Sequence, residues 1–124
     1  MKIGDLAKST GVSVPTIRLY EREGLIAPAQ RTSGQSRIFS ESHEARLVLI
    51  KRLRLLGFEL EQIRPLLALL TDSRSKPLAE FIPMLAHDVR WRIEMLLRLQ
   101  RAIGKVADGS AEVGLIQEAI TTER

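Results

Sequence analysis

Residues 1–25, MKIGDLAKSTGVSVPTIRLYEREGL, decide the fold of this chain because they carry the pattern of two short helices around a tight turn. Apolar residues recur at helical spacing on both sides of a break centred on Gly11. Gly11 can adopt the left-handed conformation that ends a helix, and the Ser13 hydroxyl can cap the helix that follows. Pro15 falls in the first turn of that helix, where its missing N–H costs little. The stretch therefore predicts a helix-turn-helix with helices over residues 3–10 and 14–23.

A small hairpin is predicted directly after the helix-turn-helix. Gly24 ends the second helix, and residues 30–39, QRTSGQSRIF, then place a turn at residues 33–35 before a short strand. The basic residues Arg31 and Arg37 flank that turn. A hairpin in this position is a wing, so the sequence predicts a winged helix-turn-helix.

Two further helices are predicted to complete the first domain. Ser40 is the expected N-cap of the first, Gly57 closes it, and its apolar stripe consists of Leu47, Val48, Ile50, Leu53 and Leu56. The second helix covers residues 60–70 and contains Pro65, which removes one backbone hydrogen bond, so we expect a bend or a late start there. The whole pattern predicts an all-α fold with a small β wing.

A long helix is predicted over residues 77–106, after a polar linker at residues 71–76. Pro83 is expected to bend this helix or to delay its opening turns. Apolar residues step along it by three or four positions, as in a coiled coil, and the resulting stripe exceeds what the small domain can cover. We therefore expect antiparallel pairing with the same helix of a second subunit. The predicted dimer seam consists of Leu85, Val89, Ile93, Leu96, Leu99 and Ile103.

The charge distribution favours a polyanionic partner. Residues 1–64 carry 11 Lys and Arg against 7 Asp and Glu, whereas residues 65–124 carry 8 of each, so the whole excess of +4 lies in the first half. Such an asymmetry suits the phosphate backbone of a nucleic acid. The absence of cysteine excludes disulfides, thiolate metal sites and thiol redox sensing. The sequence shows no membrane-spanning run and no signal-peptide pattern, which predicts a cytoplasmic protein.

Signatures of catalysis and of small-ligand binding are weak. The sequence shows no nucleophile–base pair, phosphate-binding loop or metal cluster, so it predicts no enzyme, no cofactor and no metal. His43 and His87 lie far apart and lack carboxylates at metal-ligand spacing. Met84, Trp91 and Met95 fall at helical spacing, which favours packing in a core or dimer over a ligand pocket.

Three segments of the chain resemble the mercury-resistance-regulator (MerR) family of bacterial transcription factors. They are IGDLAKSTGVSVPTIRLYEREGLI at residues 3–26, RTSGQSRIFS at residues 31–40 and LIKRLRLLGFELEQI at residues 49–63. The segments keep the family's order without gaps. The sequence departs from the family pattern at three positions. Leu19 stands where an aromatic residue is common in the family, and Ser36 stands where a tyrosine or glutamine is common. Glu59 stands where a helix-capping serine is common.

The resemblance implies a homodimer in which each chain has a DNA-binding domain at residues 1–70, a linker at 71–76, a dimerisation helix at 77–106 and a tail at 107–124. Paired recognition helices would enter successive major grooves of a two-fold operator, while the wings grip the flanking backbone. Family members bend and untwist promoters so that RNA polymerase can align with both promoter elements, which uses DNA deformability as an energy term. The implied partners are double-stranded DNA, a second copy of the chain and RNA polymerase.

The residues expected to contact DNA lie on the recognition helix, the wing and the helix after it. Thr16 and Arg18 are placed near base edges and adjacent phosphates. Tyr20 is expected to bond a phosphate, to pack under the wing, or both. The arginines are expected to be phosphate clamps, although each taken singly also fits a solvated arginine. The predicted DNA-binding set is Ser13, Thr16, Arg18, Tyr20, Arg31, Arg37 and Arg54.

The tail leaves the effector undefined. In the copper and zinc sensors of the family a loop after the long helix holds metal through two cysteines. Here the segment KVADGSAEVGLI, residues 105–116, offers Lys105 and Val113 as the nearest equivalents, and neither binds a soft metal. One helical turn is expected near residues 115–120.

Two other functions remain open from the sequence. The same winged helix would suit an architectural or recombination-directionality protein that binds DNA without controlling a promoter. A protein-interaction module is the third possibility, with the long helix binding a different partner.

Overall fold

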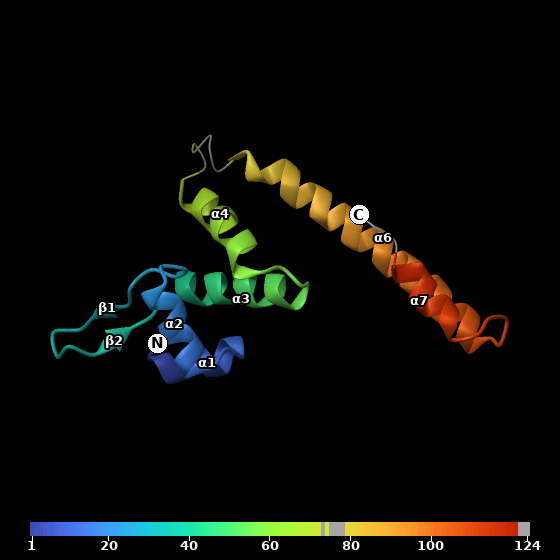
Figure 1. Cartoon of the computed structure of the whole chain (residues 1–124). Coiled ribbons are helices and arrows are strands. Elements are labelled where there is room, and N and C mark those ends of the chain that lie inside the picture. Colours follow the sequence, from blue (N-terminus) through green and yellow to red (C-terminus); the bar gives the residue numbers. More distant parts are fainter. Residues whose placement is uncertain (73, 75–78, 122–124) are drawn as a thin grey trace. The chain divides into compact units, whose positions relative to one another are not determined.

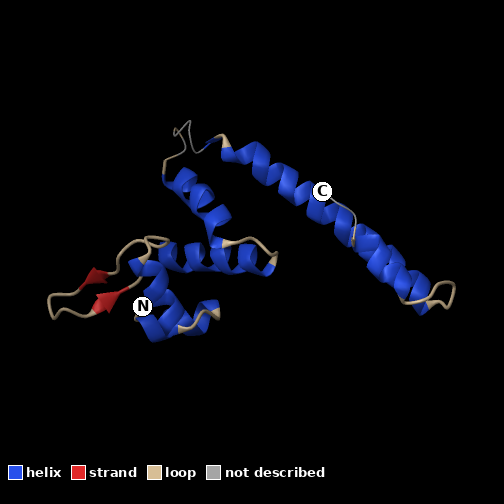
Figure 2. Cartoon of the chain, viewed as in Figure 1, coloured by secondary structure: helices blue, strands red, loops and turns tan. Residues whose placement is uncertain are grey.

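The computed structural model describes residues 1–72, 74 and 79–121. These residues fall into two compact units, residues 1–75 and residues 76–124, and each unit is described by itself. Helices account for most of both units, and the first also carries a two-stranded sheet (Figure 1, Figure 2). This is the all-α class with a small β wing that the sequence predicts. None of the described helices is both long enough and apolar enough to cross a membrane.

The helix-turn-helix forms where the sequence predicts it. Helix α1 (Ile3–Thr10) ends at Gly11, whose φ of 72° is left-handed and whose N–H donates back into the helix at 2.9 Å. Helix α2 (Val14–Arg22) starts after Ser13, whose Oγ accepts a hydrogen bond from the Thr16 N–H at 3.3 Å. Both caps satisfy backbone groups that a helix end leaves without a partner. The turn between the helices is therefore fixed by the residues that the sequence marks.

The wing is an antiparallel hairpin of β1 (Gln30–Arg31) and β2 (Arg37–Ile38). Arg31 lies opposite Arg37 in the register of the strands. The turn is closed by Gln35, the one residue other than glycine with a positive φ, 69°, in the part of the chain that the structure describes. The hairpin extends outward from the helices as a narrow arm (Figure 1).

Helices α3 (Glu41–Leu55) and α4 (Leu60–Thr71) complete the first unit. The predicted cap at Ser40 is confirmed, and an imidazole completes it, because the Ser40 N–H donates to His43 Nδ1 at 3.0 Å. His43 Nε2 lies 3.0 Å from the Ala27 carbonyl oxygen. The buried His43 ring therefore connects the start of α3 to the segment that leads into the wing.

Two expectations for these helices are wrong. Leu56, predicted in the apolar stripe of α3, is 66% exposed because α3 ends at Leu55 and Leu56 is its C-cap residue. The alternative of a late start at Pro65 also fails, since α4 begins at Leu60 and includes the proline. The Glu59 N–H donates to the side chain of Gln62 at 2.9 Å, which anchors the first turn of α4 ahead of Pro65.

The core of the first unit draws on all four helices and the wing. Its largest fully buried side chains are Leu6, Ile17, Phe39, Leu47, Ile50 and Ile63. The first residue of the chain is tied to the base of the wing: the Met1 terminal amine donates to the Phe39 carbonyl, and the Phe39 N–H donates to the Met1 carbonyl, both at 2.7 Å. One small core thus holds α2 and the base of the wing together.

The second unit pairs a long helix with a short one. Helix α6 (Phe81–Ala107) contains Pro83 in its first turn. The predicted start at residue 77 lies outside the described residues, so the expected bend or delay at Pro83 stays a prediction. Helix α7 (Gly114–Ile120) folds back along the end of α6 and is longer than the single turn expected from the sequence (Figure 1). Met95 and Ala102 of α6 are buried, whereas Met84 is exposed.

Candidate nucleic-acid interface

One side of α2 faces a hollow that is rich in hydrogen-bond donors. Ser13, Thr16 and Tyr20 line it from the helix-turn-helix, and Lys51 and Arg54 line it from α3. Four of the seven residues predicted to bind DNA therefore meet at one place. Hydroxyl and cationic side chains of this kind form most protein contacts to nucleic-acid phosphates.

Lys51 is a member of this group that sequence reasoning did not select. Its Nζ donates to the Thr10 carbonyl at 3.2 Å, at the C-terminal end of α1. A cation at a helix C-terminus is favourable, so this contact holds the charge beside the helix-turn-helix. The two residues are 41 positions apart, and no local pattern in the sequence predicts that they meet.

Two of the hydroxyls in the hollow, those of Ser13 and Thr16, are already hydrogen-bonded to each other. Ser13 Oγ donates to Thr16 Oγ1 at 2.8 Å while it accepts from the Thr16 backbone. Arg54 Nη1 donates to the Phe58 carbonyl at 3.3 Å and lies 3.2 Å from Glu59 Oε2. Its guanidinium therefore closes the end of α3 and forms an exposed ion pair, and the predicted phosphate contact of Arg54 stays a prediction.

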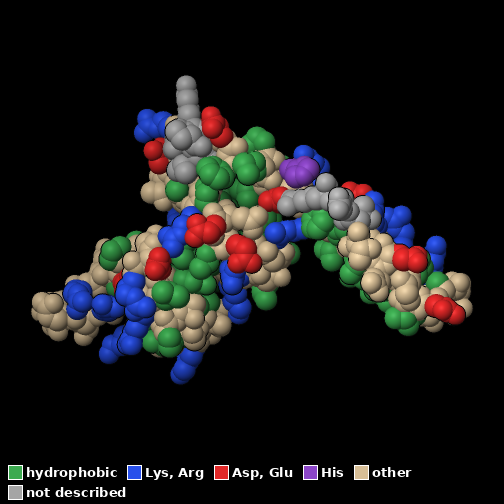
Figure 3. Space-filling model, viewed as in Figure 1, with side chains coloured by type: hydrophobic (Ala, Val, Ile, Leu, Met, Phe, Trp, Pro, Cys, Tyr) green, Lys and Arg blue, Asp and Glu red, His purple; other side chains and the backbone are tan. Residues whose placement is uncertain are grey.

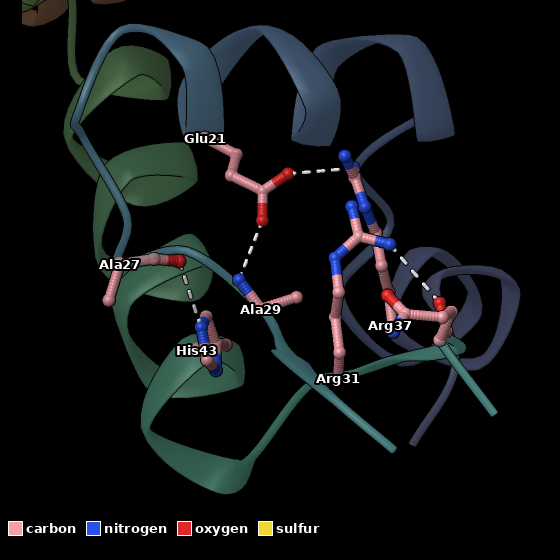
Figure 4. A network of polar contacts seen from close by, with 7 residues as sticks. Glu21, Ala27, Ala29, Arg31, Arg37 and His43 are labelled. Carbon is pink, nitrogen blue, oxygen red and sulfur yellow. Dashed lines mark hydrogen bonds and ion pairs between the residues drawn. The ribbon is translucent and has the colours of Figure 1, made fainter. Parts of the chain in front are cut away.

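The opposite side of α2 carries a second group of cations. Arg18 and Arg22 of the helix line a hollow there together with Glu21, Ile3 and Arg37 of β2. Arg37 Nη1 lies 2.9 Å from Glu21 Oε1. Figure 4 shows this contact as a dashed line. Two more of the predicted residues, Arg18 and Arg37, are thus brought together, apart from the hollow that contains Tyr20.

Arg31 lies on the wing opposite Arg37 in the strand register, and it lines neither hollow. Its Nη1 donates to the Gln35 carbonyl at 3.1 Å, a bond that stays inside the hairpin (Figure 4). Lys and Arg side chains are prominent over the wing and the helices next to it in the view of Figure 3. Six of the predicted DNA-binding residues therefore line two hollows on opposite sides of α2, and Arg31 lies on the hairpin outside both hollows.

The predicted dimer seam lies on a face of α6 that α7 leaves open. Val89, Ile93, Leu96 and Ile103 are 41%, 52%, 63% and 48% exposed. Leu85 and Leu99 are half-buried. A groove of about 500 Å³ runs along this face, lined by Ile93, Leu96, Leu97, Leu99, Gln100 and Ile103. Hydrophobic side chains follow this helix in Figure 3.

Comparison with known proteins identifies the family. A family model described as MerR HTH family regulatory protein matches residues 1–70, and a second, described as MerR, DNA binding, matches residues 44–105. The chain belongs to the MerR family. Its residues 1–70, which contain α2 and the wing, are the part that the first model recognises.

Individual MerR proteins are similar over most of the chain. The mercuric resistance operon regulatory protein of Bacillus cereus is 36% identical over 82% of this chain and 79% of its own length. The HTH-type transcriptional regulator ZntR homolog of Haemophilus influenzae is 49% identical over 66% of this chain and 59% of its own length. A crystal structure assigned to a MerR family transcriptional regulator of Listeria monocytogenes has a TM-score of 0.73 and 27% identity, covering 95% of this chain and 92% of that one.

These MerR relatives are transcription regulators rather than enzymes, and the function of this chain is DNA-binding transcription regulation. The described residues contain no cluster of three or more His, Cys, Asp or Glu side chains that could hold a metal ion. Both ring nitrogens of His43 are occupied by the contacts to Ser40 and Ala27. In this MerR protein, His43 is therefore a structural residue of the DNA-binding unit.

Proposed function

We propose that this MerR protein acts as a homodimer that reads a two-fold promoter operator with a pair of α2 helices. The observation that carries the proposal is the hollow beside α2, where three hydroxyl side chains meet Lys51 and Arg54. A DNA backbone that passes along this hollow would receive donors from α2 and α3 at once. That contact would place the outer face of α2 in the adjacent major groove.

Individual residues take different parts in this proposal. Thr16 and Arg18 lie near the start of α2, on the two flanks of its exposed face, where base edges come within reach. Lys51, Arg54 and Tyr20 contact phosphates and set the register of the protein on the duplex. Arg31 contacts the backbone from the wing.

The homodimer in this proposal is supported by the open apolar face of α6. Isolated surface apolar residues are ordinary, but a continuous groove of aliphatic side chains marks an interaction surface. An antiparallel pair of α6 helices would cover this face in both copies and would hold two DNA-binding units at a fixed distance. A fixed distance between recognition helices is what a two-fold operator requires.

The regulatory step in this proposal is deformation of the promoter, which would let RNA polymerase align with both promoter elements. The family resemblance supports this step. The chain supplies no thiolate ligand, because it contains no cysteine. The signal would therefore be something other than a soft metal held by cysteines of this chain.

Binding to DNA from upstream of its own gene tests the proposal. Anisotropy of a labelled duplex would be measured between about 50 and 200 mM salt, with a random duplex of equal length as control. We expect binding to the upstream duplex at least about a thousandfold tighter than to the random one, with log K falling linearly as log salt rises. Equal affinity for both duplexes would contradict the proposal. Tight binding with no effect on transcription in vitro would instead favour the architectural role.

A further inference from the structure

Glu21 connects the recognition helix to both arms of the wing. Its Oε1 lies 2.9 Å from Arg37 Nη1 on β2, and its Oε2 accepts a hydrogen bond of 2.6 Å from the Ala29 N–H just before β1 (Figure 4). The Glu21 side chain is only 13% exposed. Both carboxylate oxygens of one residue on α2 are therefore engaged by the hairpin.

The wing needs such a connection because its own sheet is small. Strands β1 and β2 have two residues each, and an isolated two-stranded hairpin is marginally stable in water. The base of the wing is fixed by the Met1–Phe39 pair and by His43. Among the hydrogen bonds and ion pairs that the described residues show, the Glu21 contacts are the ones that reach the wing from α2.

The Glu21 contacts also change the part that Arg37 can play. The carboxylate of Glu21 offsets the charge of Arg37. The Arg37 guanidinium points toward Glu21 on α2 (Figure 4). Arg31, by contrast, has an uncharged partner, the Gln35 carbonyl. Among the ion pairs that the described residues form, the wing therefore carries one arginine paired with a carboxylate, Arg37, and one that is not, Arg31.

We infer that Glu21 is a positioning residue for DNA binding: it holds the wing at a fixed orientation to α2, and Arg37 serves this link instead of clamping a phosphate. The inference rests on the proposed contact of α2 and the wing with DNA. A wing that is already held in place loses little conformational entropy when the protein binds DNA. The Glu21 link therefore raises the affinity for DNA although Glu21 itself does not contact it.

Removing the charge of Glu21 distinguishes this role from plain electrostatics. A carboxylate near a phosphate backbone is repelled, so Glu21→Gln would tighten binding if charge alone mattered or if it released Arg37 onto a phosphate. If Glu21 positions the wing, the same substitution weakens binding. The two interpretations predict opposite signs.

The experiment compares Glu21→Gln, Arg37→Gln and the double variant with Arg31→Gln as the matched control, in the salt titration described above. We expect each of the first two to weaken binding about fivefold, as for a partly shielded charge-assisted contact, and the double variant to be no weaker than either. We expect the salt slope of the double variant to change by less than about 0.3. We expect Arg31→Gln to reduce the slope by about 0.9 for each phosphate that the protein no longer neutralises, or about 1.8 per dimer.

Tighter binding by Glu21→Gln, or a salt slope that falls in Arg37→Gln as far as in Arg31→Gln, would overturn the inference. Circular dichroism and thermal unfolding of each variant confirm that α2 is folded, and hydrogen exchange of the wing amides should rise in Glu21→Gln. Unchanged exchange in Glu21→Gln would also overturn it. Failure of the wild-type chain to prefer its upstream DNA would instead refute the proposed function, so the two failures are distinguishable.

Discussion

Val89→Glu would place a charge in the proposed seam of α6, where Val89 is 41% exposed. The exposed fractions of Val89, Ile93, Leu96 and Ile103 together equal about two whole aliphatic side chains, and burying one such side chain contributes about 1.5–3 kcal/mol, so the seam supplies roughly 6–12 kcal/mol per dimer. The substitution removes roughly 1 kcal/mol of that in each subunit. It also places a carboxylate where desolvation costs several kcal/mol.

The free energy of dimerisation should weaken by at least about 4 kcal/mol, which raises the dissociation constant of the dimer roughly a thousandfold. Sedimentation at low micromolar chain concentration should show a dimer for the wild-type chain and a monomer for Val89→Glu. Operator binding should disappear with the dimer. Val113→Glu is the matched control, because Val113 is 70% exposed, lies outside α6, and accepts the same substitution away from the seam. A Val89→Glu variant that still sediments as a dimer would show that the seam is elsewhere.

The remaining predictions concern the DNA contact, the helix-turn-helix and the end of α6. Arg18→Ala should weaken specific binding by about 1–3 kcal/mol and relax sequence preference, whereas unchanged affinity and preference would exclude a base contact. Gly11→Ala should lower the free energy of unfolding by about 1–2 kcal/mol, because Gly11 has a φ of 72° and an added Cβ would run into the Lys51 amine. Gly4→Ala should raise it by roughly 0.5 kcal/mol, because the new Cβ in α1 meets open space; equal effects in denaturant unfolding would refute this contrast. Hydrogen bonds from Ser110 and the nearby Lys105 charge lower the pKa of Asp108 below 3.8, so its stabilising contribution is present above that value and is lost as pH falls through the lowered one. Asp108→Asn should remove this contribution to the loss of helix content at low pH. A variant whose helix content falls at low pH as in the wild-type chain would contradict the prediction.

The local signals in the sequence were sufficient for most of the fold. Gly11, Ser13 and Ser40 mark helix ends by their own backbone and hydroxyl chemistry, which depends on neighbours within a few positions. The predictions were wrong at two helix ends. Leu56 fits the helical stripe, yet the chain has already left α3 there. Pro65 is tolerated because the first turn of α4 is anchored before it.

The sequence was enough to predict most residues of the candidate site, but it did not predict which distant residues they contact. Ser13, Thr16 and Tyr20 share one side of α2 by helical geometry, so their meeting follows from the sequence. The contact of Lys51 with Thr10 joins residues distant in the chain, and its signal lies only in the packing of α3 against α1. The pairing of Arg37 with Glu21 likewise depends on how the hairpin folds over α2.

The most direct test of the central claim is the stoichiometry and footprint of the complex with upstream DNA. Sedimentation of the complex together with hydroxyl-radical footprinting would report both quantities in one preparation. Two chains per duplex, with two protected half-sites separated by a whole number of helical turns, is the result predicted from paired α2 helices. One chain per duplex with a single protected half-site would contradict the account.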